Sequence, residues 1–247
     1  MKLYEAVLRA ARQVDDVYEG TSTSGSPTYI VDTKMNQPEG HYTKGALVIS
    51  SGSMAGTVAS INQHIGTKFT FDSIGTAPED GSAFTAITKN FTANQIIAAI
   101  HEALATIEVP KIDTTHSVTD GECTLVDVSN VRRVFVDAAS NHTWSEVDGM
   151  LKFADGATGD LEIWYMAHPS KPSGYSSDID PAIDDEWLMW ATVTNLYRKH
   201  VQVLRKDNPT LIDMLNEAKN NEAIARQNAI RRQLRSMKYQ PRYGVLK

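Results

Sequence analysis

Cysteine is almost absent from this chain of 247 residues, because Cys123 is its only one. A single cysteine forms no disulfide within the chain and builds no cysteine-based zinc site. No apolar run approaches the roughly 18 residues of a membrane-spanning helix, so we expect no membrane partner. The first 20 residues place acidic side chains where a signal peptide would have an unbroken apolar core. We therefore expect the protein to act, or to be assembled, where it is made.

Catalytic motifs are also missing. The chain has no nucleophile elbow, no glycine-rich phosphate loop and no metal-binding pair of histidines one helical turn apart. The Gly- and Ser-rich run Ser50–Gly56 resembles an anion-binding nest, but it joins two β-prone runs and is better explained as a hairpin turn. We expect no enzyme, and no catalytic residue, metal ion or cofactor.

Other chemistry-bearing residues have structural explanations. The densest acidic group precedes and begins a predicted helix, where it complements the helix dipole better than it would hold a divalent ion. This group contains Asp178, Asp180, Asp184, Asp185 and Glu186. The histidines, including His101 and His168, lack partners at ligand spacing. The four tryptophans, Trp144, Trp164, Trp187 and Trp190, are explained by core packing more simply than by a sugar platform.

The charge is divided unevenly along the chain. The net charge is −6, yet residues 196–247 carry 12 Lys and Arg against 4 Asp and Glu. The preceding 195 residues hold 12 basic and 26 acidic side chains. Such segregation indicates partners of opposite sign or head-to-tail self-association.

Apolar spacing predicts the order of elements. Steps of three and four residues predict a helix over residues 2–19, which Gly20–Pro27 breaks. Residues 28–91 contain β-prone runs separated by glycines, typical of a small barrel or sandwich. These runs are Tyr29–Val31, Ala46–Ile49, Thr57–Ile61, Lys68–Phe71 and Ala83–Ile87. Thr92 is placed to cap a second helix over Ala93–Ile107, which Pro110 prevents from continuing.

A second β region follows, and two helices come after it. We predict strands over Gly121–Val128, Val131–Val136, Trp144–Phe153 with an Asp148-Gly149 turn, and Gly159–Ala167. Pro181 suits the first turn of a helix whose periodic part is Ile183–Arg205. Thr210 is placed to cap a last helix over Leu211–Met237, and an extended tail follows.

The predicted fold class is α+β. A helical platform, made of the N-terminal helix and two C-terminal helices, would carry β-rich insertions and end in an extended tail. Its segments would be 1–27 and 92–110 for the platform, 28–91 and 111–169 for the β regions, 181–238 for a helical arm, and 239–247 for the tail.

The arm ends in a strongly basic segment. Residues 226–247 contain seven basic side chains and no acidic one. These are Arg226, Arg231, Arg232, Arg235, Lys238, Arg242 and Lys247. The tail adds the aromatic and apolar residues Tyr239, Tyr243, Val245 and Leu246. A solvated helix face explains the charge, but a segment that orders against a partner protein, or one that neutralises nucleic acid, explains it too.

The layout resembles a family of virion proteins. The pattern over Gly45–Gly56, then Phe69–Phe71, and the strand entry Ala77–Phe84 are similar to those of tailed-bacteriophage proteins. The later pattern resembles the head-to-tail adaptor (connector) proteins of the phage neck. It consists of Trp144, Asp148-Gly149, Leu151–Phe153, Gly159–Tyr165 and His168-Pro169, with two helices behind them.

The resemblance implies a structural virion protein at the head–tail interface, assembled in the host cytoplasm. Usually twelve copies form a ring below the portal, and DNA passes through its channel without sequence-specific binding. Portal docking would fall to Arg231, Arg232, Arg235, Lys238, Tyr239, Arg242, Tyr243, Val245, Leu246 and Lys247. Acidic residues would line the channel, and other tail or neck proteins would be further partners. The insertion 28–91 exceeds a minimal adaptor.

Three alternatives remain open. One is a tail-tube terminator or another neck protein. The second is an adhesin or carbohydrate-binding module, which the glycine-punctuated strands and the tryptophans favour. The third is an enzyme whose site forms between subunits.

Overall fold

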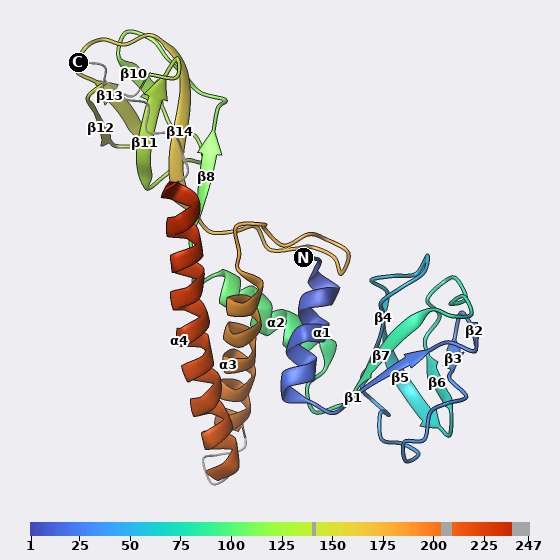
Figure 1. Cartoon of the computed structure of the whole chain (residues 1–247). Helices are drawn as coiled ribbons and strands as arrows, with labels where there is room; N and C mark the ends of the chain where they lie inside the picture. The colour runs from blue at the N-terminus through green and yellow to red at the C-terminus, as the bar shows by residue number, and fades with distance from the viewer. Residues whose placement is uncertain (140–141, 204–208, 239–247) are drawn as a thin grey trace. The chain divides into compact units, whose positions relative to one another are not determined.

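The computed structural model describes residues 1–139, 142–203 and 209–238, with helix α4 described by its backbone alone after Arg232. The chain forms two compact units, residues 1–104 with 171–247, and residues 105–170. Helices and antiparallel sheets are both present (Figure 1), so the predicted α+β class is confirmed.

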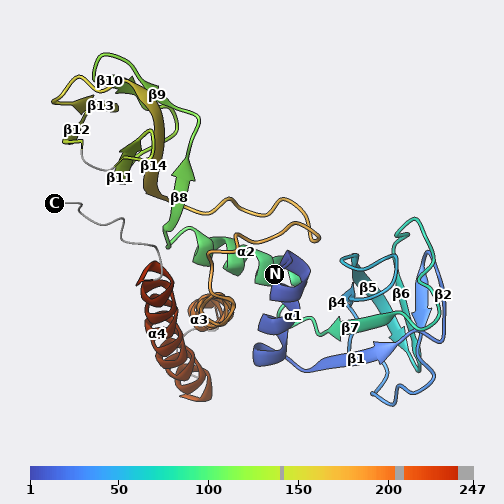
Figure 2. The same ribbon diagram turned by 45° about the horizontal axis from the view of Figure 1, so that its top comes forward.

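The first unit contains the helices. They are α1 (Leu3–Val14), α2 (Ala93–Leu104), α3 (Asp185–Val203) and α4 (Pro209–Lys238). Helix α3 lies between α4 on one side and α1 and α2 on the other (Figure 2). Most of the predicted apolar positions face this packing, with Val7, Ile96 and Leu188 fully buried.

Helix α1 is shorter than predicted. It ends at Val14, and residues 17–21 form a strand instead of continuing the helix to residue 19. The reason is tertiary, because Asp15 leaves the helix in an extended conformation and its carboxylate accepts hydrogen bonds from the backbone N–H (3.0 Å) and hydroxyl (2.7 Å) of Thr88. The range Gly20–Pro27, predicted as a break, likewise lies largely in two strands.

The first turn of α1 is completed by residues far along the chain. The N–H of Leu3 donates to the carbonyl of Ser177 at 3.0 Å, and that of Tyr4 to the carbonyl of Tyr175 at 2.9 Å. The N–H groups of a first helical turn have no partner inside the helix. The segment around residues 175–179 therefore serves as a cap for α1.

The other helix ends test the predicted caps. Thr92 and Gln95 exchange side-chain and backbone hydrogen bonds, so Thr92 caps α2 as predicted, although α2 ends at Leu104 and not at Ile107. Helix α3 is capped by Asp184, whose carboxylate accepts from the N–H of Trp187 at 3.1 Å. Pro181 therefore precedes the helix and does not lie in its first turn. Helix α4 begins at Pro209, so Thr210 lies inside it and is not its cap.

Seven strands of the first unit form one antiparallel sheet. They are β1 (Val17–Thr21), β2 (Ser24–Ser26), β3 (Tyr29–Val31), β4 (Ala46–Ile49), β5 (Val58–Ile65), β6 (Lys68–Phe71) and β7 (Ala83–Ile87). Their order is β1-β7-β4-β5-β6-β3-β2. The outermost strands, β1 and β2, are separated in the chain by only Ser22 and Thr23, so the sheet must curl until its edges nearly meet. The five β-prone runs predicted within residues 28–91 all contribute to this barrel-like sheet, although β5 begins at Val58 and not at Thr57 and continues to Ile65.

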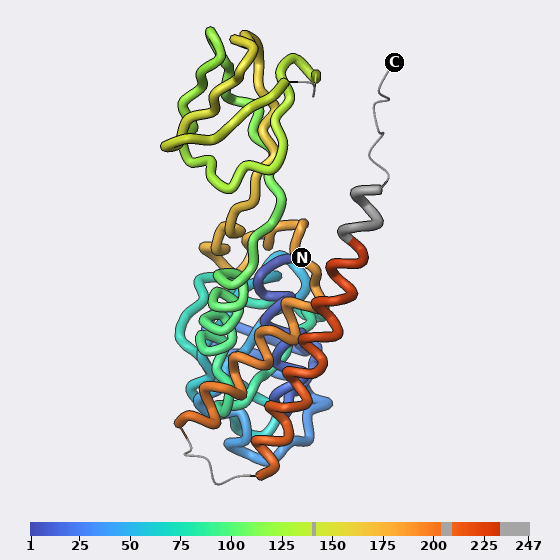
Figure 3. Tube along the Cα trace, turned by 90° about the vertical axis from the view of Figure 1, so that its left-hand side faces the viewer, coloured from blue at the N-terminus to red at the C-terminus, as the bar shows by residue number. Residues whose placement is uncertain are grey.

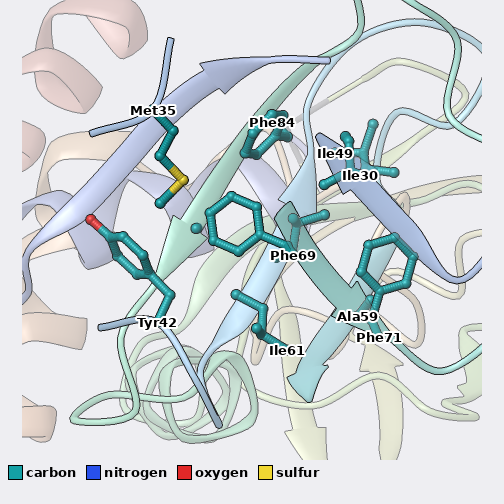
Figure 4. Packing of buried hydrophobic residues seen from close by; sticks show 11 residues of the cluster. Ile30, Met35, Tyr42, Ile49, Ala59, Ile61, Phe69, Phe71 and Phe84 are labelled. Atoms are coloured by element: carbon teal, nitrogen blue, oxygen red, sulfur yellow. The ribbon is translucent and has the colours of Figure 1, made fainter. Parts of the chain in front are cut away.

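Aromatic and aliphatic side chains fill the inside of the curled sheet (Figure 4). Phe69 is fully buried at the centre, with its ring 5.6 Å from that of Phe84 and 5.9 Å from that of Tyr42. Tyr42 lies outside any strand and comes from the connection between β3 and β4. The barrel core therefore depends on a loop residue as well as on the alternating strand residues.

One carboxylate is buried beside this core. Asp32 accepts hydrogen bonds from the Tyr18 hydroxyl at 2.8 Å and from the N–H groups of Thr21 (3.0 Å) and Lys34 (2.9 Å). Burial by itself would raise the pKa of Asp32, but these bonds outweigh it and lower that pKa below its ordinary value. Gly20 is packed against the same carboxylate, because a Cβ built there would lie 2.5 Å from Asp32 Oδ2.

The second unit is built of β-strands. They are β8 (Val109–Asp113), β9 (Ser117–Val118), β10 (Glu122–Thr124), β11 (Val131–Val136), β12 (Trp144–Val147), β13 (Met150–Phe153) and β14 (Gly159–Ala167). The predicted bounds of β11 and β14 are met, and Asp148-Gly149, both at positive φ, makes the predicted β12–β13 turn. Strand β10 covers only part of Gly121–Val128, and β8 and β9 were not predicted.

Strands β8 and β14 form both the entry to and the exit from this unit. Val109, the first residue of β8, is the register partner of Ala167, the last residue of β14. Between these ends the unit encloses its own core, centred on Leu151 and Ile163, which are fully buried. The unit therefore has the features of an inserted domain.

Candidate functional site

The residues predicted to dock a partner fall into three groups. Tyr239, Arg242, Tyr243, Val245, Leu246 and Lys247 lie outside the described residues. Arg235 and Lys238 lie in the last turns of α4, of which only the backbone is described. Arg231 and Arg232 are described in full and have different surroundings. The candidate site is therefore the outer side of α4.

Arg232 is engaged within its own unit. Its guanidinium lies 3.0 Å from Asp184 Oδ2 and 3.0 Å from Glu186 Oε2, at the start of α3. Arg9 of α1 makes a third ion pair there, 3.3 Å from Asp185 Oδ2. Arg232 thus fastens α4 to α3, a role different from the partner docking predicted for it.

These contacts also explain the acidic group before α3. Asp184 caps the helix through Oδ1 and binds Arg232 through Oδ2. Asp180 accepts a hydrogen bond from the N–H of Ala182 at 3.0 Å, so it organises the turn that leads into the helix. The capping role predicted for this group is confirmed for Asp184. Among the residues that the structure describes, no three His, Cys, Asp or Glu side chains converge as metal ligands.

Arg231 is exposed, and within the described ranges it has no ion-pair partner. It belongs to a helix that uses only a narrow stripe for packing. Leu215, Ala218 and Ala225 are buried against α3, at spacings of three and seven residues. The rest of α4 faces outward, and it is the outermost of the four helices (Figures 1 and 3).

Large apolar side chains are exposed on α4 as well. Ile224 is 57% exposed and Ile230 is 48% exposed, and Ile212 and Met214 are also exposed. Single exposed apolar residues are common on soluble proteins, but several on one outer helix indicate a contact surface. The outer side of α4 therefore combines free charge with apolar area.

The acidic charge gathers in the other unit. Residues 105–170 contain 11 acidic and four basic side chains, whereas the remaining chain holds 19 acidic and 20 basic. The contrast inferred from the sequence, an acidic body against a basic arm, is thus mainly a property of the inserted unit and of the end of α4.

The Ser50–Gly56 loop joins β4 to β5, as predicted for a hairpin connection. Its hydroxyl groups are used within the protein. Ser50 Oγ donates to the carbonyl of Ala83 at 3.2 Å, Ser51 Oγ accepts from the Ala83 N–H at 2.7 Å, and Ser53 Oγ donates to Glu79 at 2.6 Å. These bonds fix the loop on the entry to β7, where it has a structural role.

The tryptophans are divided between the two units. Trp187 is buried in α3, as predicted for a core residue, and Trp190 is half-buried there. Trp144 packs against the core of the second unit, and Trp164 Nε1 donates to Glu162. His168 is bonded through Nδ1 to the carbonyl oxygen of Ile107 at 2.9 Å, so it too has a structural partner.

No helix within the described ranges is long and apolar enough to cross a membrane. No model of a known protein family matches the chain, and no curated protein matches its sequence.

Proposed function

We propose that this chain is a non-enzymatic structural subunit of a tailed-phage virion, an adaptor that forms a ring at the neck and joins the portal to the tail. The observation that carries the proposal is the outer side of α4. It is exposed, it carries Arg231, which has no ion pair among the described residues, and it leads into a basic segment. A helix packed along only one narrow stripe has the rest of its surface available for another protein.

The chain order suits such a subunit. The barrel-like sheet lies in sequence between α1 and α2, and the acidic unit between α2 and α3. We propose that the four helices form a platform that builds the ring, and that the two β regions are insertions reaching neighbouring rings. The resemblance to adaptor proteins supplies the expected copy number of twelve.

In this proposal α4 and the tail dock on the portal. Arg231, Arg235 and Lys238 with Tyr239–Lys247 supply charge and apolar anchors. Arg232 has a different role, because its ion pairs to Asp184 and Glu186 hold α4 on α3. It positions the docking helix and does not contact the portal.

The acidic unit contributes to the DNA channel in the same proposal. Eleven acidic residues within residues 105–170 give this unit a strongly negative field. A negative channel wall repels DNA phosphates and so lets the DNA pass without sequence-specific binding.

The test mixes the purified full chain with purified portal rings and measures complexes by mass photometry and negative-stain imaging. We expect a ring seated on the portal. Deletion of residues 239–247, or Arg231→Glu, should abolish the complex while circular dichroism stays unchanged. Arg132→Glu, an equal change at an exposed position of the second unit, is the matched control. A wild-type chain that forms neither ring nor portal complex contradicts the proposal.

A tail-tube terminator or another neck protein is the second candidate, since the same exposed helix suits docking on a tail ring. Locating the subunit in a virion density map separates the two positions. Of the four tryptophans that favour a carbohydrate-binding module, Trp187 is buried and is unavailable to a sugar.

A further inference from the structure

The outward side of α4 has acidic residues in its first half and basic residues at the matching positions of its second half. Two such helices placed antiparallel therefore bring opposite charges together. Helical spacing of three and four residues places Asp213, Glu217, Asn220, Ile224, Asn228 and Arg231 on one stripe, and the helix carries the series on to position 235, an arginine. We call these seven positions the α4 stripe. It lies about 130° around the helix from the residues buried on α3.

The pattern is centred on Ile224. Glu217 and Arg231 stand seven residues before and after it, Asn220 and Asn228 four residues, and Asp213 and Arg235 eleven. Each acidic residue of the first half is thus matched by an arginine at the same separation in the second half. Reversal of the helix exchanges the two halves and leaves the centre in place.

The charged side chains of the stripe that the structure describes make no ion pair in their own unit. Asp213, Glu217 and Arg231 are exposed, and none of them makes an ion pair within the described part of the chain. Like charges also lie near one another along the helix, because Asp213 and Glu217 are four residues apart, and so are Arg231 and Arg235. Like charges at this spacing destabilise a helix unless an opposite charge lies beside them.

The central residue adds the apolar contribution. Ile224 is 57% exposed, more than any other large apolar side chain that is described in α4. It is not among the residues of α4 that are buried on α3, which are Leu215, Ala218 and Ala225. More than half of this isoleucine is in contact with water in the single subunit, so it is placed to be covered by a partner.

We infer that the α4 stripe binds the same stripe of a second copy of this chain, with the two helices antiparallel and Ile224 of each copy on the two-fold axis. In that arrangement Glu217 of each copy faces Arg231 of the other, Asn220 faces Asn228, and the apolar centre is covered. The contact is isologous, so each pairing occurs twice. The interface is argued from α4 alone, but it covers Arg231, which the proposed function assigns to portal docking. On one copy the two contacts therefore exclude each other, and Glu217→Arg is the variant that tests self-association without changing a proposed docking residue.

The first experiment measures the mass of the full chain by sedimentation equilibrium at low and high salt. We expect an association that weakens as salt rises, because exposed ion pairs are screened. Glu217→Arg and Arg231→Glu should each abolish it at concentrations where the wild type is half associated. Arg226→Glu is the matched control, since Arg226 is exposed on the opposite side of α4 from the stripe.

Charge swapping tests the pairing itself. Glu217→Arg and Arg231→Glu are each self-repelling, but an equimolar mixture of the two variants should associate, because every facing pair then has opposite signs. The double variant Glu217→Arg/Arg231→Glu should associate by itself. Single variants that keep the wild-type mass, or a mixture that stays dissociated, overturn the inference.

Cross-linking tests the direction. Ile224→Cys should form a covalent dimer on mild oxidation, whereas Glu217→Cys should not, because in the antiparallel pair its two copies lie about 21 Å apart along the axis. The wild type, whose only cysteine is the buried Cys123, is the blank. Cross-linking of both variants indicates parallel helices and overturns the inference, as does cross-linking of neither.

Discussion

Asp32 is the buried charge on which the barrel core depends. Its carboxylate accepts from the Tyr18 hydroxyl and from two backbone N–H groups, and only 2% of the residue is exposed. These donors lower its pKa in spite of burial. A carboxyl group whose pKa is lower in the folded than in the unfolded state stabilises the protein at pH values above the unfolded-state pKa. This contribution is lost as the pH falls through the folded-state pKa.

Replacement of Asp32 by Asn should therefore cost stability in a pH-dependent way. We expect the free energy of unfolding to fall by about 1–3 kcal/mol at pH 7, because a charged acceptor of three hydrogen bonds is lost. The gap between variant and wild type should begin to narrow below about pH 4, where the carboxyl of the unfolded chain takes up a proton, and it should close as the pH falls through the lowered pKa of the folded protein. Urea unfolding at pH 7 and pH 3 measures both values, and a gap that does not depend on pH contradicts the account.

A side chain at Gly20 should destabilise the protein, because the glycine is closely packed. A Cβ there would lie 2.5 Å from Asp32 Oδ2, 2.6 Å from Tyr18 Cε1 and 2.7 Å from Phe84 Cζ. Gly20→Ala should lower the free energy of unfolding by about 1–3 kcal/mol through overpacking. Gly174→Ala is the control, because its Cβ would meet nothing nearer than 3.6 Å. Equal stability of the two variants in urea would show that the barrel core is looser than described.

Residue-level prediction from the sequence succeeded where the signal is local. The short β-prone runs of β3, β4, β6 and β7 follow from their residue types and the glycines between them, and the Asp148-Gly149 turn follows from turn chemistry. Gly20 could not be singled out, because its requirement comes from Asp32 and Phe84, which the fold brings to it. From the sequence alone, Gly20 is interpreted as part of a helix-breaking run.

At the scale of the element, α4 is held on α3 by packing along one stripe and by one arginine. Beyond its narrow buried stripe, Arg232 ties it to Asp184 and Glu186 of α3. Asp184 is more enclosed than its partner, with its side chain only 14% exposed. The ion pair is therefore placed to hold the outer helix locally.

Arg232→Ala should loosen the end of α4 more than it destabilises the whole protein. We expect the free energy of unfolding to change by less than about 1 kcal/mol, as for other exposed ion pairs. Amide hydrogen exchange in the turns around residue 232 should accelerate clearly, because local opening no longer has to break the two contacts. Arg226→Ala, with no such contacts, is the control, and unchanged exchange in both variants argues against a fastening role.

The end residues of a helix are harder to predict from the sequence than the presence of the helix. All four helices were predicted, yet α1 stops five residues early because Asp15 binds Thr88 and the next residues pair with β7. The apolar residue Val17 fits a helical stripe and a strand equally well. Val17 lies in a strand because it pairs with β7, which comes some 70 residues later in the chain.

At the scale of the whole molecule, the second unit is separable. Its entry and exit residues, Val109 and Ala167, are register partners in adjacent strands, and its core is its own. The first unit likewise has a core within the barrel and a packed set of helices. Adjacent ends are what permit a domain to be inserted or removed without strain.

Replacement of residues 109–167 by a short Gly-Ser linker should leave the first unit folded. We expect the helical circular dichroism signal to be retained, with cooperative thermal unfolding, because none of the four helices lies in the removed segment. A molten or insoluble product would show that the first unit needs the second. The same variant should have a markedly less negative charge, which ion-exchange elution checks.

The candidate site was only partly predictable. A basic end to the last helix is visible in composition, and Arg231 and Arg232 were both named from it. The sequence could not tell them apart, because the partners of Arg232 lie 46 and 48 residues earlier, at the start of α3. The α4 stripe was missed for a different reason, since charge counts ignore the order in which signs follow one another on a helix face.

The cap on α1 has a consequence for synthesis on the ribosome. The carbonyls that complete its first turn belong to Tyr175 and Ser177, and the helix packs on α3. The barrel-like sheet, in contrast, is complete in its strands once Ile87 has been made. The emerging chain can therefore close the barrel early. Helix α1 is translated first, but its first turn is capped only after residues more than 160 positions later have been made.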